Sequence, residues 1–176
     1  MRFPHSIFRI SYLTALPAAC CLLLAVSSCK VRYGFSGAQT DARTATVMYF
    51  QNNASLAKPT ISQTFTEAMK DILQSQGKLD LVDKGGEILF EGQITGYSVA
   101  PVAIQSNDQS SANRLTITVF VKFTNEKEGA RNFESSFSRY ADFSSSQSLS
   151  AVEDQLIREI TDQLVQDIFN RALSDW

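Results

Sequence analysis

The sequence predicts an α+β fold, a two-layer sandwich in which two helices pack on one face of a four- or five-stranded, mostly antiparallel sheet. Residues 115–124 alternate apolar and polar side chains, as a strand with one buried face does. Residues 61–73 and 152–173 instead repeat apolar side chains at helical spacing. Elements that each carry one apolar face bury those faces against one another, and this predicts the two layers.

Residues 1–28 have the organisation of a bacterial lipoprotein signal peptide. A short basic segment precedes an apolar stretch, residues 10–26, and two serines stand directly before Cys29. We therefore expect cleavage before Cys29 and acylation of its thiol and amino group, which would anchor the protein permanently on a membrane. An uncleaved membrane-spanning helix is the alternative, but the stretch is at the short end of the roughly 17–25 residues required and contains Pro17.

The part of the chain that follows the signal peptide has a limited chemistry. Two of the 16 basic residues precede Cys29, which leaves 14 against 18 acidic residues and a formal charge of −4. This balance argues against nucleic-acid binding, which calls for a basic surface. His5 is the only histidine, and Cys20 and Cys21 also belong to the signal peptide. Without histidine or a free thiol, the usual nucleophilic and zinc sites are excluded, so we expect neither catalysis nor a cofactor.

A carboxylate-pair hydrolase is the enzymatic alternative that this composition leaves open. Glu87 and Glu91 share one face of a predicted strand, and Asp80 and Asp83 flank a predicted turn. Solvated polar faces explain both pairs more simply, because most isolated acidic residues lie on protein surfaces.

The first elements follow from composition and from helix-start signals. Residues 29–43 are rich in small and polar side chains and predict a tether, and a single α+β domain is predicted over 44–176. The domain begins with a strand, residues 44–50, because β-branched and aromatic side chains dominate there. Thr60 and Gln63 then have the spacing of a capping box, which predicts the start of the first helix.

Two strands are predicted between the first helix and the middle of the domain. A short strand, residues 79–82, is followed by a glycine turn and a longer strand, residues 88–97. The longer strand carries Gly92 and Gly96, which indicate a bulge or the close packing of a helix. Its alternation places Tyr97 on the outward, polar face.

The remaining elements complete the predicted sandwich. Pro101 opens a polar segment that is predicted to be a loop before the strand at 115–124. A charged turn then leads to the last strand, residues 133–140. Ser150 and Glu153 form a second possible capping box, which predicts the start of a helix that continues to the C-terminus.

The outward face of the predicted sheet is rich in hydroxyl groups. Its members are Thr95, Tyr97, Thr116, Thr118, Lys122, Ser136, Ser138 and Tyr140. A solvated antiparallel sheet explains this composition, and so does a surface that enters the polar lumen of a large outer-membrane β-barrel. Composition alone does not separate these two interpretations.

The order and spacing of several short motifs resemble the LptE family of lipopolysaccharide-assembly lipoproteins. The motifs are the lipidation box ending at Cys29, Tyr33-x-Phe35-x-Gly37, Phe50-x-Asn52, the segment 61–68, Phe90-x-Gly92-x-Ile94-x-x-Tyr97 and the segment 165–169. The resemblance extends over essentially the whole mature chain and implies the two-helix fold. It also implies an outer-membrane lipoprotein, lipid-anchored and facing the periplasm, that plugs the LptD barrel, helps to assemble it and assists lipopolysaccharide insertion.

The resemblance implies that basic side chains bind the anionic lipopolysaccharide. The candidates are Arg114 and Lys122, on one face of the clearest strand, and Arg139, near the end of the neighbouring strand. Ordinary surface charge is the alternative, because a charge of −4 creates no broad anion-attracting field. The candidates for contact with the LptD barrel are Tyr97, Pro101, Thr116, Thr118, Ser136 and Tyr140. A stand-alone periplasmic glycan- or lipid-binding lipoprotein is the other functional hypothesis.

Overall fold

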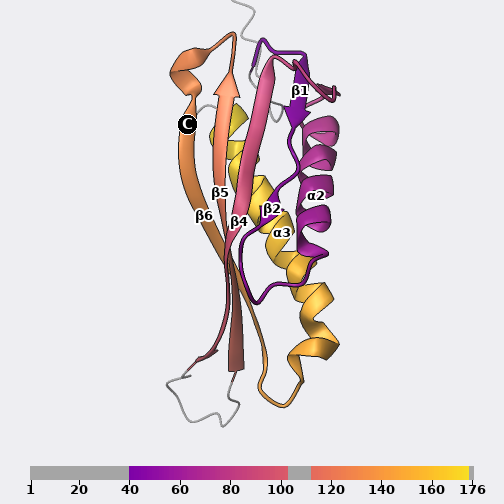
Figure 1. Ribbon diagram of the computed structural model, residues 1–176, viewed down its shortest axis with the longest axis vertical. Coiled ribbons are helices and arrows are strands. Elements are labelled where there is room, and N and C mark those ends of the chain that lie inside the picture. The colour runs from indigo at the N-terminus through magenta and orange to yellow at the C-terminus, as the bar shows by residue number, and fades with distance from the viewer. Residues whose placement is uncertain (1–39, 103–111, 175–176) are drawn as a thin grey trace, which may run out of the picture. The chain divides into compact units, whose positions relative to one another are not determined.

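The structure, a computed structural model, describes residues 40–102 and 112–174 (Figure 1). The strands are β1 (Thr44–Val47), β2 (Gln51–Asn52), β3 (Asp80–Leu81), β4 (Ile88–Val102), β5 (Ala112–Asn125) and β6 (Phe133–Ser144). The helices are α2 (Ile61–Ser75) and α3 (Leu149–Leu173), and a short 3-10 turn, η1 (Gly129–Arg131), precedes β6. The predicted signal peptide, Cys29 and most of the predicted tether lie outside the described residues.

The six strands form one mixed sheet. Their order is β3-β1-β4-β5-β6, and β2 also pairs with β4. The β4–β5 and β5–β6 pairs are antiparallel, whereas β1 and β2 run parallel to β4, and β1 runs parallel to β3. The sheet is therefore larger than the predicted four or five strands, and its parallel part was not predicted. The chain passes from β1 and β2 through α2 before it enters β3 and β4. Because α2 returns the chain to the end of the sheet where β1 begins, the later strands run in the same direction as β1.

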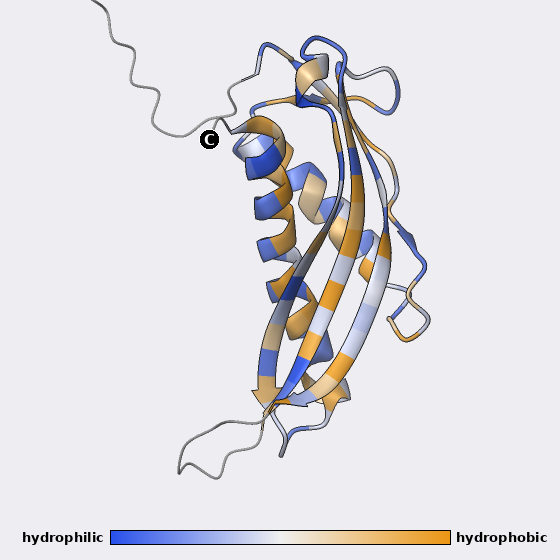
Figure 2. Cartoon of the chain, turned by 90° about the vertical axis from the view of Figure 1, so that its left-hand side faces the viewer, coloured by the Kyte–Doolittle hydropathy of each residue, from blue (hydrophilic) through white to orange (hydrophobic). Residues whose placement is uncertain are grey.

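Both helices lie on the same face of the sheet, as predicted (Figure 1). Helix α2 packs against β1, β2 and β3, and α3 packs against β5 and β6. Along the strands, apolar residues alternate with more polar ones (Figure 2), and the apolar set is buried beneath the helices. The rings of Phe50 and Phe65, 4.8 Å apart, join the β-layer to α2 in this core. The opposite face of β4, β5 and β6 is not covered by either helix.

Neither predicted capping box forms. Thr60 precedes α2, but its backbone already has helical angles and its side chain caps no N–H group; the Gln63 side chain bonds instead to Glu67. Helix α3 begins before Ser150, which therefore lies inside the first turn. Glu153 is buried rather than capping. Both helices are held chiefly by their buried faces, because tertiary packing outweighs local signals of this size.

A bulge in β4 reverses which of its side chains face the helices. Ile94 pairs with Val119, but the next pair is Gly96 with Thr118, so Thr95 is an extra residue. Beyond this point the buried positions change from even to odd numbers. Tyr97 is consequently turned towards the helices and is only 8% exposed. The bulge predicted from the glycines is present, whereas the prediction that Tyr97 faces outward is wrong.

Gly92 provides the first test of this packing. A Cβ atom at Gly92 would lie 2.5 Å from the Phe50 ring and closer still to the carbonyl oxygen of Phe120. Since the backbone oxygen cannot move away easily, we expect Gly92→Ala to lower the free energy of unfolding by about 2 kcal/mol in urea denaturation. Gly129→Ala is the control, because its Cβ would meet nothing closer than 4.0 Å. Equal midpoints for the two variants would contradict the close approach of Phe50 to β4.

Candidate functional site

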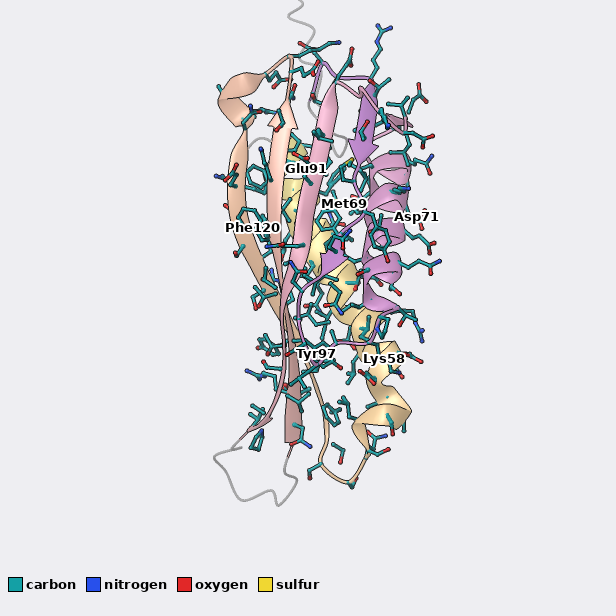
Figure 3. The ribbon with its side chains drawn as sticks, in the orientation of Figure 1. Lys58, Met69, Asp71, Glu91, Tyr97 and Phe120 are labelled. Carbon is teal, nitrogen blue, oxygen red and sulfur yellow. The ribbon has the colours of Figure 1, made fainter. Side chains whose placement is uncertain are left out.

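The candidate site is the open face of β4, β5 and β6, where side chains stand in cross-strand rows. The rows are Glu91–Lys122–Glu134, Gln93–Phe120–Ser136, Gly96–Thr118–Ser138, Ser98–Thr116–Tyr140 and Ala100–Arg114–Asp142. Figure 3 shows Glu91 and Phe120 on these strands. Four of the six residues predicted to contact a partner, Thr116, Thr118, Ser136 and Tyr140, therefore share one surface, which we call the open face.

The other two predicted contact residues lie elsewhere. Tyr97 is buried on the helix side of the sheet, as the bulge requires. Pro101 does not open a loop but lies within β4, paired with Asn113, and is exposed near the end of the strand. Asn113 pairs in turn with Phe143, which is buried on the helix side of the sheet. Pro101 therefore points to the helix side as well and does not belong to the open face. Most of the predicted polar loop after it lies outside the described residues.

The centre of the open face is uncharged. Thr118 and Ser138 place their hydroxyl oxygens 3.1 Å apart. The Thr95 hydroxyl donates a hydrogen bond to the backbone oxygen of Thr118, at 3.3 Å. Phe120 adds one partly exposed aromatic ring, which was not among the predicted contact residues. Short side chains of this kind let another backbone or side chain approach closely, and their hydroxyl groups can both donate and accept hydrogen bonds.

Charged side chains occupy the two ends of the open face. At one end, the Lys122 Nζ atom lies 4.0 Å from Glu91 Oε2 and 3.9 Å from Glu134 Oε1. Such long, exposed pairs contribute little to stability. At the other end, Arg114 binds Asp142 with two hydrogen bonds of 2.7 and 2.9 Å. These bonds raise the pKa of the Arg114 guanidinium and lower the pKa of the Asp142 carboxyl group.

The Arg114 guanidinium also stacks on Tyr140. Its central carbon lies 3.6 Å from the centroid of the Tyr140 ring, a geometry in which the cation is attracted to the aromatic face. Tyr140 remains 50% exposed. Tyrosine and arginine are enriched among the residues that dominate binding at protein interfaces.

The three basic candidates do not form one anion site. Arg114 and Lys122 are eight residues apart on β5, which separates them by about 27 Å. Arg139 pairs with the buried residue Ile117, so it faces the helix side of the sheet, in the middle of β6 and not near its end. Its guanidinium binds Asp167 of α3 with hydrogen bonds of 2.5 and 2.8 Å. Each candidate thus has a carboxylate close to it.

The structure also shows where the two pairs of acidic residues considered for hydrolysis lie. Glu87 Oε1 lies 2.7 Å from Lys127 Nζ, and this hydrogen bond is the main cause of the lowered pKa of Glu87. Glu91 faces Lys122 on the open face. Asp80 lies in β3 and Asp83 in the exposed turn that follows.

A partly buried polar cluster that the sequence patterns did not predict lies on the helix side of the sheet. The Tyr97 hydroxyl donates to Glu153 Oε1 at 2.6 Å, and Glu153 Oε2 lies 3.2 Å from Lys58 Nζ. Lys58 also binds Asp154, at 2.8 Å; Figure 3 shows Lys58 and Tyr97. Burial, followed by the bond to Glu153, raises the pKa of Tyr97 far above its ordinary value, so the hydroxyl stays a donor. The cluster joins β4, α3 and the loop before α2.

Comparison with known proteins adds an independent finding. The sequence model of the LptE family, described as "Lipopolysaccharide-assembly", matches residues 42–172. No curated protein matches the chain in sequence. None of the helices within the described ranges is long and apolar enough to cross a membrane.

Several solved structures are similar in fold. A minor lipoprotein from Acinetobacter baumannii is 13% identical with a TM-score of 0.50, and the match covers 74% of this chain and 91% of that one. A protein from Xanthomonas campestris is 9% identical with a TM-score of 0.51, over 78% of this chain and 86% of that one. The rare lipoprotein B from Shewanella oneidensis is 10% identical with a TM-score of 0.46, over 73% and 92%. At these identities the first two likenesses show the fold alone.

The partly buried polar cluster gives a second prediction. Tyr97→Phe leaves Glu153 Oε1 without its donor, and we expect the free energy of unfolding to fall by about 1–2 kcal/mol. Tyr140→Phe removes an exposed hydroxyl and should change it by less than about 0.5 kcal/mol. Urea unfolding followed by circular dichroism measures both variants. The account of the cluster is wrong if Tyr140→Phe is the more damaging of the two.

Proposed function

The chain belongs to the LptE family of lipopolysaccharide-assembly proteins, and from this membership we propose that it is an outer-membrane lipoprotein, anchored through Cys29 and facing the periplasm. In this role it plugs an LptD-like barrel, helps the barrel to assemble, and assists the transport of lipopolysaccharide into the outer leaflet. The observation that carries the proposal is the uncharged, hydroxyl-rich centre of the open face.

The chemistry of the open face suits the lumen of a barrel. The lumen of a large outer-membrane barrel is polar, and hydroxyl groups can exchange their hydrogen bonds with water for hydrogen bonds with its side chains. Buried charges without partners are costly, but the charged residues of the open face lie at its ends and face one another. Tyr140, held by Arg114, supplies an aromatic contact next to this polar centre.

A role in cargo contact is proposed for Arg114 in preference to the other two basic candidates. Its guanidinium has the planar fork that suits phosphate groups and lies on the open face. Lys122 shares that face but stands between two glutamates. Arg139 is bound to α3 on the other side of the sheet. An anionic group of lipopolysaccharide would have to replace Asp142 at Arg114.

Co-purification tests the proposal. The full-length protein with a C-terminal tag is recovered from detergent-solubilised outer membranes, and we expect a large β-barrel protein to be recovered with it in a stable complex. A stand-alone glycan- or lipid-binding lipoprotein would be recovered without a barrel. Recovery without any barrel partner would therefore overturn the proposed function.

Thr118→Arg provides the third prediction. Thr118 is at the centre of the open face, so a long charged side chain there would be buried without a partner in the complex. We expect the yield of the barrel complex to fall at least about tenfold, because unpaired buried charges cost several kcal/mol. The melting temperature of the protein alone should change little, since Thr118 is partly exposed on the face that neither helix covers.

The matched control is Gln155→Arg, an equal change of charge on the exposed side of α3. It should leave the yield of the complex unchanged. Equal yields for Thr118→Arg and Gln155→Arg would remove the open face from the interface.

A further inference from the structure

A groove runs between α2 and α3 on the side of the helices that faces away from the sheet. Its first part is a hollow of about 500 Å³ lined by both helices. A second hollow shares Asp71 and Asp162 with the first. A third continues the groove past Gln76 and Gln166, whose side chains bond across it at 3.0 Å. Figure 3 shows Asp71 on the outer side of α2.

The first hollow is strongly acidic. Glu67 and Asp71 of α2 and Asp154 and Asp162 of α3 line it, against one basic residue, Arg158. Asp154 is bound to Lys58 outside the hollow. Within residues 40–102 and 112–174, the carboxylates of Asp71 and Asp162 form no ion pair. The two helices therefore bring uncompensated negative charge to the two walls of one groove, which attracts cations.

Thr161 is a second and independent sign of a ligand. Thr161 is among the residues that line the same hollow and is only 1% exposed, and its buried hydroxyl has no hydrogen-bond partner among the described residues. Other helical threonines of this chain bond to the carbonyl one turn earlier, Thr64 to Thr60 and Thr66 to Ser62. A buried hydroxyl without a partner is unfavourable and uncommon. At Thr161 it leaves an oxygen ready to accept a hydrogen bond.

From these observations we infer that the groove binds a basic side chain, a lysine or arginine, that a partner protein presents. The cationic head is held by Asp71 and Asp162 and donates a hydrogen bond to the Thr161 hydroxyl. Ala68 and Ile157, which also line the hollow, contact the aliphatic stem. The inserted side chain enters the part of the groove that precedes the hydrogen bond between Gln76 and Gln166, and the groove lies on the opposite side of the protein from the open face. Both surfaces can therefore be occupied at once.

The arrangement of acidic residues favours a basic side chain over a metal ion. Within the described ranges, no three His, Cys, Asp or Glu residues come close enough together to hold a metal. A lysine ammonium needs only hydrogen-bond acceptors placed around it, and two carboxylates and a hydroxyl supply them.

Peptide binding tests this inference. Fluorescently labelled, N-acetylated tetralysine is titrated into the full-length protein in detergent, and binding is followed by anisotropy. We expect the double variant Asp71→Asn/Asp162→Asn to bind at least tenfold more weakly. The control, Asp83→Asn/Glu126→Gln, removes the same charge from exposed turns outside the groove and should bind within twofold of the original protein. An equal loss in both double variants would show non-specific attraction and overturn the inference.

The variant Thr161→Val tests whether the Thr161 hydroxyl takes part in binding or whether acidic charge alone attracts the peptide. Removal of an unpaired buried hydroxyl should raise the melting temperature by about 3 °C, while the affinity for tetralysine falls several-fold. An unchanged affinity would overturn the role of Thr161. Spermidine or Mg²⁺ that binds more tightly than tetralysine would overturn a protein side chain as the occupant.

Discussion

Burial of one face of β5, against which α3 packs, is the interaction on which the other features depend. Leu115, Ile117, Val119, Val121 and Phe123 are each at most 1% exposed. Because side chains alternate across a strand, this burial turns Thr116, Thr118 and Phe120 to the uncovered side. Residues of β4 and β6 that pair with these positions point to the same side of the sheet. The orientation of β5 therefore determines which residues of all three strands form the open face. The polar centre and the apolar core are thus two consequences of one packing arrangement.

The bulge in β4 changes this alternation so that Tyr97 can bond to helix α3. With an extra residue at Thr95, the strand turns Tyr97 inward, where its hydroxyl reaches Glu153. Without the bulge, the same tyrosine would stand on the open face and Glu153 would have one donor fewer. The inserted residue therefore keeps the bulky Tyr97 side chain off the open face. It also provides a hydrogen bond between β4 and the N-terminal half of α3. The acidic groove depends on the same helix, because α3 supplies one of its walls.

Much of the fold could be predicted from the sequence, because apolar periodicity reports directly on burial. It predicts both helices, the strands around Val119 and Phe137, and the common face on which the helices pack. It does not predict that β1 runs parallel to β4, since periodicity carries no strand direction, nor the inward turn of Tyr97, since one inserted residue reverses parity. Arg139 and the helix groove depend on how separate elements pack together. The short motifs, by contrast, indicate the LptE family through their order and spacing alone.

Site-specific photo-cross-linking tests the proposed contact between the open face and the barrel most directly. A benzophenone amino acid is placed at Ser138, beside Thr118 in the centre of the face, or at Gln155 on the exposed side of α3, in otherwise unchanged cells. Illumination should join the protein to a large outer-membrane barrel from position 138 and not from position 155. A cross-link to the barrel from position 155, with none from position 138, would contradict the account.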